Sequence, residues 1–316
     1  MANRLAVIAI GGNSLIKDRM HQAVRDQYIA AHETTEHVAS MIADGWNVIV
    51  GHGNGPQVGF ILRRSELAAH ELHEVPLDVC GADSQGAIGY ALVQNLDNVL
   101  RRRQLERPVV AVVTQTEVAR DDPAFTHPSK PIGSFMDADE ARRRHDEDGW
   151  DVVEDANRGW RRVVASPRPM RIVEIDAIRS LIDAGAIVVA VGGGGIPVVA
   201  DDAGDLYGVE AVIDKDLGCS LLSQILHADL FLITTAIEKV ALNFGTAEES
   251  FVDHLSLAEA KRYLKEGTHF AKGSMEPKVE AIVEYLERTG GRAIVTNPAN
   301  VEAALAGATG THFSVD

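Results

Sequence analysis

Short runs of apolar residues alternate along the chain with longer stretches in which apolar positions recur at helical spacing. The apolar runs cover residues 5–10, 46–50, 109–113, 186–191, 230–233 and 293–295. Strands that are apolar throughout are typical of a parallel sheet that is covered on both faces. The pattern therefore predicts an α/β protein with a mostly parallel sheet and helices as the connections between strands.

The helical stretches follow these strands closely. They are predicted over residues 22–44, 57–72, 84–103, 174–184, 214–227, 257–265, 277–289 and 301–305. No internal repeat and no low-complexity linker interrupts the alternation. We therefore expect a single domain over residues 1–316, in which an N-terminal half (about 1–190) and a C-terminal half (about 191–316) share one sheet.

One stretch, residues 121–162, departs from this alternation. It has few aliphatic residues, many charges, three prolines and two tryptophans. This composition does not fit a strand–helix unit, so we expect an inserted, lid-like subdomain that rises from the edge of the sheet. A segment with few apolar contacts has low local stability, and it is therefore predicted to move as a lid.

Charge and cysteine content narrow the choice of partners and compartment. The chain has 46 acidic and 30 basic residues, a net charge of −16, which argues against nucleic acid or an anionic membrane as a partner. The longest apolar run, residues 186–200, is shorter than the roughly 20 residues of a membrane-spanning helix. Two cysteines cannot form a disulfide framework, so we expect a cytoplasmic enzyme.

Three glycine clusters follow three of the predicted strands. They are Gly11-Gly12-Asn13, the run 51–55 and the run 192–195. At the carboxyl ends of parallel strands, glycine lets the backbone approach an oxyanion, and the next helix offers free N–H groups. Each cluster could instead form a tight turn and nothing more, but the three together favour phosphate or carboxylate binding. No P-loop motif and no dinucleotide-binding motif is present.

Several lysines lie in unusual settings. Lys130 is enclosed by prolines within the insertion, Lys215 lies between two aspartates at a predicted helix start, and Lys278 follows a glycine-containing turn. Phosphoryl transfer needs cations of this kind, because charge is spread over the transferring oxygens. The flanking Asp214 and Asp216 could be ordinary helix N-terminal residues. Alternatively, one of them could hold these lysines by ion pairing or lie near a metal ion on ATP.

Together, these motifs resemble those of the carbamate kinases, a branch of the amino-acid kinase superfamily. The matches run nearly from end to end and are highly specific as an ordered set. They comprise the segments 9–13, 52–59, 84–90, 122–133, 166–167, 192–197, 210–216 and 273–279.

The resemblance implies reversible phosphoryl transfer between ATP and carbamate, giving carbamoyl phosphate and ADP with Mg²⁺. It also implies a homodimer and a three-layer αβα sandwich around an open sheet of about eight strands, with a small protruding subdomain. Ala9 stands where many amino-acid kinases carry a lysine, and the resemblance implies that Lys130 reaches into the site instead.

The resemblance also assigns roles to individual residues. The catalytic group would be Lys130, Lys215, Asp216 and Lys278, with Asp216 organising the lysines that contact the ATP phosphates. Gly11, Gly12 and Asn13 would bind the transferring phosphoryl group, and Gly53, Asn54 and Gly55 would hold the carbamate. Gly193, Gly194, Asp214 and Met275 would contribute to the nucleotide site, with adenine near residues 230–233 and no metal ligand from the protein itself.

Three positions depart from the family pattern. They are Asp83, Met136 and Lys272, of which Asp83 and Lys272 are expected near the pocket, where they would retune the acceptor. One alternative is therefore a paralogue that phosphorylates another small carboxylate or carbamate-like acid. The other is a nucleotide-binding sensor without turnover, against which the retained lysines argue.

Overall fold

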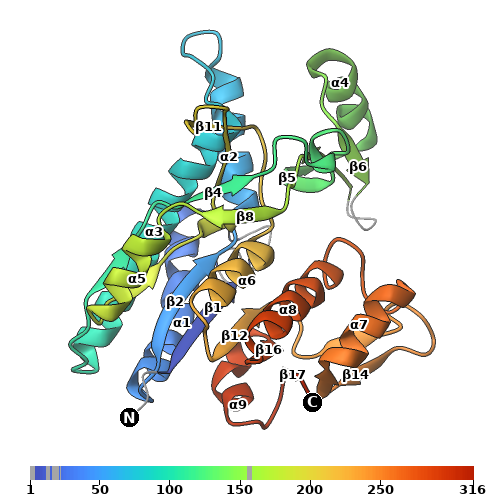
Figure 1. Ribbon diagram of the computed structural model, residues 1–316. Coiled ribbons are helices and arrows are strands. Elements are labelled where there is room, and N and C mark those ends of the chain that lie inside the picture. The colour runs from blue at the N-terminus through green and yellow to red at the C-terminus, as the bar shows by residue number, and fades with distance from the viewer. Residues whose placement is uncertain (1–3, 12–14, 16–20, 22, 155–158) are drawn as a thin grey trace.

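The computed structural model describes residues 4–11, 15, 21, 23–154 and 159–316. An eight-stranded sheet runs through the molecule in the order β15-β17-β16-β12-β1-β2-β9-β3 (Figure 1). Its strands are β15 (His254–Ser256), β17 (Thr311–Ser314), β16 (Arg292–Thr296), β12 (Leu230–Thr234), β1 (Leu5–Ile10), β2 (Asn47–His52), β9 (Ile187–Val189) and β3 (Val109–Ala111). All neighbouring pairs are parallel except β16 with β17. The expected α/β fold around a mostly parallel sheet of eight strands is confirmed.

Helices cover both faces of this sheet. The α-helices of the described chain are α1 (Val24–Ala43), α2 (Gly55–Ala68), α3 (Leu77–Arg102), α4 (Ala138–Asp148), α5 (Ile175–Asp183), α6 (Lys215–Ile225), α7 (Leu257–Glu266), α8 (Glu276–Thr289) and α9 (Val301–Leu305), of which α4 lies apart from this sheet (Figure 1). Helix α3 begins seven residues before its predicted start at residue 84, directly after Pro76. Glycines at positions 81 and 86 of this helix lower its intrinsic propensity, which is why its first turns are not evident from sequence.

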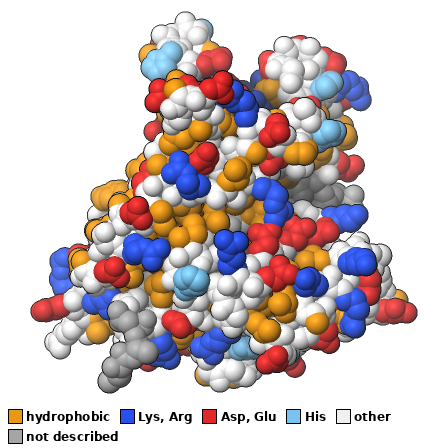
Figure 2. All heavy atoms as spheres, in the orientation of Figure 1, with side chains coloured by type: hydrophobic (Ala, Val, Ile, Leu, Met, Phe, Trp, Pro, Cys, Tyr) orange, Lys and Arg blue, Asp and Glu red, His pale blue; other side chains and the backbone are white. Residues whose placement is uncertain are grey.

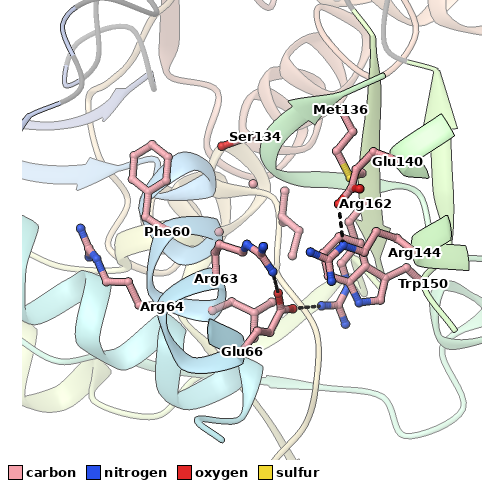
Figure 3. Close-up of a pocket in the computed structure, with 14 residues that line it drawn as sticks. Phe60, Arg63, Arg64, Glu66, Ser134, Met136, Glu140, Arg144, Trp150 and Arg162 are labelled. Atoms are coloured by element: carbon pink, nitrogen blue, oxygen red, sulfur yellow. Dashed lines mark hydrogen bonds and ion pairs between the residues drawn. The ribbon is translucent and has the colours of Figure 1, made fainter. Parts of the chain in front are cut away.

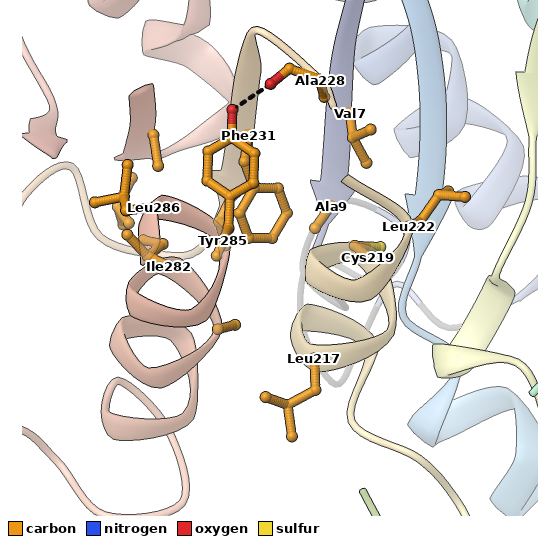
Figure 4. Close-up of a cluster of buried hydrophobic side chains, with 14 of the residues drawn as sticks. Val7, Ala9, Leu217, Cys219, Leu222, Ala228, Phe231, Ile282, Tyr285 and Leu286 are labelled. Carbon is orange, nitrogen blue, oxygen red and sulfur yellow. Dashed lines mark hydrogen bonds between the residues drawn. The ribbon is translucent and has the colours of Figure 1, made fainter. Parts of the chain in front are cut away.

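Alternate residues of the central strand β1 point to two separate cores. Val7 and Ala9 pack with α6 and α8, where the Tyr285 hydroxyl donates a 2.6 Å hydrogen bond to the Ala228 carbonyl oxygen (Figure 4). Ala6, Ile8 and Ile10 pack with α1 and α3 on the other face. Burial on both faces explains why the strand is apolar at every position.

A second, four-stranded sheet lies across the carboxyl ends of the main strands, in the order β11-β10-β4-β8 (Figure 1). Its members are β11 (Leu206–Gly208), β10 (Ile196–Ala200), β4 (Gln115–Val118) and β8 (Pro169–Ile172). A small hairpin of β13 (Val240–Leu242) and β14 (Ser250–Val252) lies in the C-terminal third. Strand β10 lies within the apolar run 186–200, where sequence alone does not separate it from β9, and the other strands of this group are only three or four residues long.

The stretch 121–162 does contain regular strands and a helix, so the expectation that it is not a strand–helix unit is wrong. A three-stranded sheet forms from β5 (Lys130–Met136), β7 (Trp160–Val164) and β6 (Val152–Glu154), with α4 inserted after β5. Ala141 is the only buried residue of helix α4. The helix is capped at its N-terminus by Asp137 and at its C-terminus by Gly149, which has the left-handed conformation. Caps and arginine–carboxylate pairs four residues apart stabilise it in place of an apolar stripe.

This three-stranded sheet and α4, which we term the protruding subdomain (residues 130–154 and 159–164), rise beside the tip of α2. The space-filling view shows a notch between the two projections (Figure 2). Its behaviour as a lid stays a prediction, as does the division of the chain into halves. Among the helices of the described chain, none is long and apolar enough to cross a membrane.

Candidate active site

Strands β1, β2 and β9 are neighbours and run parallel, so the three glycine turns that follow them meet at one edge of the sheet. A side chain at Gly193 would place its Cβ 2.1 Å from the Asn54 Nδ2. One at Gly192 would place its Cβ 2.3 Å from the His52 Nε2. Glycine is therefore required where the third turn packs against the second, and the predicted meeting of the turns is confirmed.

The first turn is described as far as Gly11, because Gly12 and Asn13 lie outside the described residues. The Gly11 N–H lies 3.4 Å from the Thr234 Oγ1 at the end of β12. A Cβ at Gly11 would approach the Thr234 carbonyl oxygen to 2.7 Å. The backbone of this turn thus lies in close contact with the end of β12. Binding of the phosphoryl group by Gly11, Gly12 and Asn13 stays a prediction.

The second turn, with Gly53, Asn54 and Gly55, leads into the N-terminus of α2. The buried Asn54 donates a hydrogen bond from Nδ2 to the Ser84 Oγ at 2.8 Å, and the Ser84 hydroxyl donates to the Gly81 carbonyl oxygen at 2.6 Å. Helix α3 therefore fixes the amide orientation. Pro56 has no N–H, so the N–H groups of Gly55 and Gln57 are the donors that the first turn of α2 can offer to an anion.

Sequence reasoning gave no role to Gln85, which ties the third glycine turn to the segment between β3 and β4. The buried Gln85 donates from Nε2 to the carbonyl oxygens of Thr114 and Gly192, at 3.1 and 2.9 Å. Its Oε1 accepts a 2.7 Å hydrogen bond from the Thr114 N–H. The Ser84-Gln85-Gly86 match was the available signal, but adjacency to Gly192 cannot be derived from sequence spacing.

His52 is fully buried beneath the second turn, and its Nδ1 lies 3.1 Å from the Gly53 carbonyl oxygen. Burial disfavours the imidazolium form and lowers its pKa from 6.5 to about 4. His52 is therefore neutral at physiological pH and supports the turn.

The predicted lysines and aspartates come together from three elements of the chain. Lys130, the first residue of β5, places its Nζ 2.5 Å from the Asp214 Oδ2. Lys215, at the start of α6, pairs with Asp216 Oδ1, and Lys278 of α8 places its Nζ 3.0 Å from Asp216 Oδ2. We call these five residues the lysine–aspartate cluster.

The start of α6 positions both aspartates. Asp214 is the N-cap residue, and its Oδ1 accepts a 2.8 Å hydrogen bond from the Asp216 N–H. Its other carboxylate oxygen faces Lys130. Asp214 thus serves as helix cap and as lysine partner at once, so both readings of the aspartates apply.

Electrostatics hold both carboxylates ionised. Burial alone would raise the pKa of Asp214 and of Asp216, but neighbouring lysine charges outweigh it and lower both values. Burial lowers the pKa of Lys215, whereas the carboxylates overcome burial at Lys278 and raise its pKa. Three lysines against two aspartates leave a formal surplus of one positive charge, which suits a phosphate group.

The remaining predicted nucleotide-site residues frame this cluster. The Gly194 carbonyl oxygen accepts a 3.0 Å hydrogen bond from the Thr116 Oγ1, and a Cβ on Gly218 of α6 would lie 2.8 Å from the Gly194 Cα. Met275, at the N-cap of α8, packs its side chain in the core. Its N–H donates to the Ala271 carbonyl oxygen at 3.0 Å, and its carbonyl oxygen accepts from the Lys278 and Val279 N–H groups at 3.0 and 3.1 Å. Nucleotide binding by Gly193, Gly194, Asp214 and Met275 stays a prediction.

The three departures from the family pattern are exposed or line a separate cavity. Asp83 is exposed on the surface of α3, and Lys272 is exposed in the turn before α8. Met136 lines a separate cavity between α2 and the protruding subdomain. At this point α3 turns Ser84 inward and leaves Asp83 at the surface. The expectation that Asp83 and Lys272 lie near the pocket and retune the acceptor stays a prediction.

Comparison with known proteins assigns the chain to a family. The model of the amino acid kinase family matches residues 4–297. The chain is 49% identical over 314 residues to the carbamate kinase-like protein YahI of Escherichia coli K12, with 98% of each chain covered. It is 45% identical over 309 residues to the carbamate kinase of Thermococcus kodakarensis, covering 96% of this chain and 97% of that one.

The fold agrees with a solved structure of the same family. Carbamate kinase from Giardia lamblia bound to AMP-PNP has a TM-score of 0.90 and 39% identity, covering 100% of this chain and 99% of that one. The chain therefore belongs to the amino acid kinase family, whose members include phosphotransferases. Within that family it groups with the carbamate kinases, so the resemblance noted from the motifs is confirmed.

Proposed function

We propose that this protein catalyses the reversible transfer of a phosphoryl group between ATP and carbamate, giving carbamoyl phosphate and ADP. The observation that carries the proposal is the lysine–aspartate cluster, in which the buried Asp216 and the half-buried Asp214 orient three lysines beside the glycine turns. The relatives named carbamate kinase and the shared fold support it.

Phosphoryl transfer requires that the substrates are positioned and that negative charge is neutralised, and different residues would serve these two purposes. Lys130 would stabilise charge on the transferring phosphoryl group, and Lys215 and Lys278 would contact the phosphates of the nucleotide. Asp216 would hold both of the latter lysines, and Asp214 would hold Lys130. Since the transition state spreads charge over the phosphoryl oxygens, fixed cations contribute more to its stabilisation than to substrate binding.

The glycine turns would hold the two reacting groups in line. Backbone N–H groups of Gly11, Gly12 and Asn13 would bind the phosphoryl group, and Gly53, Asn54 and Gly55 would bind the carbamate. The Asn54 amide is already oriented by Ser84. A preformed arrangement of this kind lowers the entropic cost of bringing two substrates together.

ATP or ADP would bind in the C-terminal half, and the solved Giardia lamblia relative with AMP-PNP bound supports a nucleotide as co-substrate. Within the described residues, no group of three His, Cys, Asp or Glu side chains could hold a metal ion. We therefore propose that Mg²⁺ enters as part of the nucleotide complex, since Mg²⁺ is commonly held by substrate phosphates with one or two carboxylates.

We further propose a homodimer in the cytoplasm, with neither nucleic acid nor a membrane as a partner. Val79 and Tyr90 expose apolar surface along one side of α3, and Val113 exposes more at the end of β3. A patch of this kind suits burial against a second copy. The acidic net charge and the two thiols support the cytoplasmic assignment.

A second candidate is a carbamate-kinase-like enzyme that phosphorylates another small carboxylate or carbamate-like acid. The 49% identity to a protein named carbamate kinase-like favours keeping it. Its other motivation is the departures at Asp83 and Met136, of which Asp83 is exposed on α3 and Met136 lines a separate cavity. A nucleotide sensor without turnover is disfavoured by the complete cluster.

The test is an acceptor panel with purified protein and MgATP. ADP formation is measured with equilibrated ammonium bicarbonate, which contains carbamate, and separately with bicarbonate, acetate, propionate and glycine. We expect the carbamate-containing solution to give kcat/KM at least about 100-fold above any other acceptor. A higher value with another acid would support the second candidate, and ATP binding without turnover on any acceptor would support the sensor.

A further inference from the structure

A cavity of about 350 Å³ lies between α2 and the protruding subdomain, apart from the lysine–aspartate cluster. Figure 3 shows side chains from both elements converging on it. Phe60 and Arg63 come from α2, Met136 from β5, Trp150 from the loop after α4, and Arg162 from β7. The volume falls in the range of sites for small organic molecules.

The charges around this cavity are unevenly paired. The Arg63 Nη1 and the Arg162 Nη1 each lie 3.3 Å from a different oxygen of the Glu66 carboxylate. Charge-assisted hydrogen bonds between arginine and carboxylate are usually 2.7–2.9 Å long, so one carboxylate is shared loosely between two guanidinium groups. By contrast, Arg144 is paired at 2.8 and 2.6 Å with Glu140 and Asp148.

Apolar and aromatic groups form the rest of the wall. Ile132 is buried, and Phe60 and Met136 are half-buried beside it. The guanidinium carbons of Arg144 and Arg162 lie 5.0 and 4.7 Å from the centroid of the Trp150 ring. A surplus of positive charge next to aromatic and aliphatic surface, in a chain with a net charge of −16, is typical of a site for an organic anion.

We propose that this cavity binds a small organic monocarboxylate with an aromatic or branched aliphatic body. The carboxylate would bind between Arg63 and Arg162, and its apolar body would lie against Phe60, Met136 and Trp150. A single negative charge matches the surplus of one guanidinium in the group of Arg63, Arg162 and Glu66, since Arg64, which also borders the cavity, points away from this group (Figure 3). A phosphate dianion would be repelled by Glu66 and Glu140, which also line the cavity.

A neighbouring hollow of about 570 Å³ shares Arg63, Glu66 and Arg162 with this cavity. Its further lining includes Glu74, Asp148 and Glu210, so it is unfavourable to an anion. We therefore expect the apolar body of the ligand to lie in the 350 Å³ cavity and not in this hollow.

Such a ligand would contact both α2 and β5, and both elements begin at the proposed site of phosphoryl transfer. Helix α2 begins at Gly55 and contributes Phe60, and strand β5 begins at Lys130 and contributes Ile132. An occupant would hold the protruding subdomain against α2 and thereby fix the position of Lys130. This consequence rests on the proposed function, whereas ligand binding itself does not.

Isothermal titration calorimetry on the full chain tests the site with 2-naphthoate, its neutral analogue 2-naphthamide and inorganic phosphate. We expect one 2-naphthoate per chain with a dissociation constant of about 1 mM or lower. We expect 2-naphthamide to bind at least about tenfold more weakly, and phosphate not to displace 2-naphthoate. Equal affinity for the amide, or displacement by phosphate, would overturn the proposal.

Variants separate this cavity from the catalytic cations. Arg63→Gln is expected to weaken 2-naphthoate binding at least about tenfold, Arg63→Lys to restore part of it, and Lys130→Ala to leave it unchanged. Arg101→Gln, at an exposed arginine of α3, is the matched control. Binding that is lost in Lys130→Ala and kept in Arg63→Gln would place the anion in the lysine–aspartate cluster and contradict the proposal, as would the absence of saturable binding.

Discussion

Lys130 and Asp214 are 84 residues apart in the sequence, yet their Nζ and Oδ2 atoms lie 2.5 Å apart. The lysine belongs to the protruding subdomain and the aspartate caps α6 in the C-terminal half. The pair therefore joins the subdomain to the cluster that we propose to bind the nucleotide phosphates. If the subdomain opens as a lid, this contact must break.

Lys130→Ala is expected to lower kcat by about 10²–10³ while the protein stays folded, because one electrostatic stabiliser of the transition state is lost. Turnover and circular dichroism should be measured on the same preparation. Lys272→Ala removes an exposed lysine and should leave turnover near that of the unmodified protein. Equal effects of the two substitutions would refute the assignment of Lys130.

Asp216→Asn is expected to lower kcat at least about 100-fold with less than about a threefold change in the dissociation constant of ADP. A neutral amide cannot balance the two ammonium groups that Asp216 now orients. Nucleotide titration and turnover on one preparation distinguish these effects, with Asp83→Asn on the exposed face of α3 as the control. A parallel loss of ADP affinity and turnover would instead make Asp216 a nucleotide-binding residue.

His52 predicts a pH dependence of stability. Its pKa is about 4 in the folded chain and about 6.5 when unfolded, so the unfolded state binds more protons as the pH falls below 6.5. The contribution of His52 to the free energy of unfolding is thus fully present at neutral pH and declines by about 2 kcal/mol on going to pH 5.

Urea unfolding at pH 7 and pH 5 measures this contribution. His52→Gln should remove most of that decline, whereas substitution of the exposed His73 by Gln should leave it in place. An unchanged pH dependence in His52→Gln would show that His52 is not the group responsible.

Gly59→Ala tests the contact between α2 and the protruding subdomain. The added Cβ would lie 2.1 Å from the Gly133 Cα, so β5 must shift away and carry Lys130 with it. We expect turnover to fall at least about tenfold and hydrogen exchange in β5 and β7 to accelerate. Gly81→Ala, at a helical glycine with open space around it, should be neutral or stabilising by up to about 1 kcal/mol. Normal turnover in Gly59→Ala would show that this contact does not position Lys130.

The main strands, and their alternation with helices, could be predicted from the sequence. Each of these strands is buried on both faces, and this burial leaves an unbroken run of apolar residues. The helix α4 could not, since its stability comes from Asp137, Gly149 and pairs such as Arg144 with Glu140. Nothing in its pattern of apolar residues distinguishes it from a charged loop.

The site was predictable at the level of residue types and motifs, and less so at the level of contacts. Asp214 and Asp216 flank Lys215 in sequence, which pointed to ion pairing. The partner of Lys130, however, depends on how β5 folds back over α6. The roles of Gln85 and of the cavity around Trp150 likewise depend on contacts between distant segments, which periodicity and spacing do not encode.

The most direct measurement of the central claim is ATP formation from ADP and carbamoyl phosphate by the purified protein in the presence of Mg²⁺. We predict one ATP for each carbamoyl phosphate consumed, with a rate that falls about 10²–10³-fold in Lys130→Ala and stays unchanged in Lys272→Ala. Failure of the folded protein to form ATP, or an equal rate in Lys130→Ala, would contradict the account.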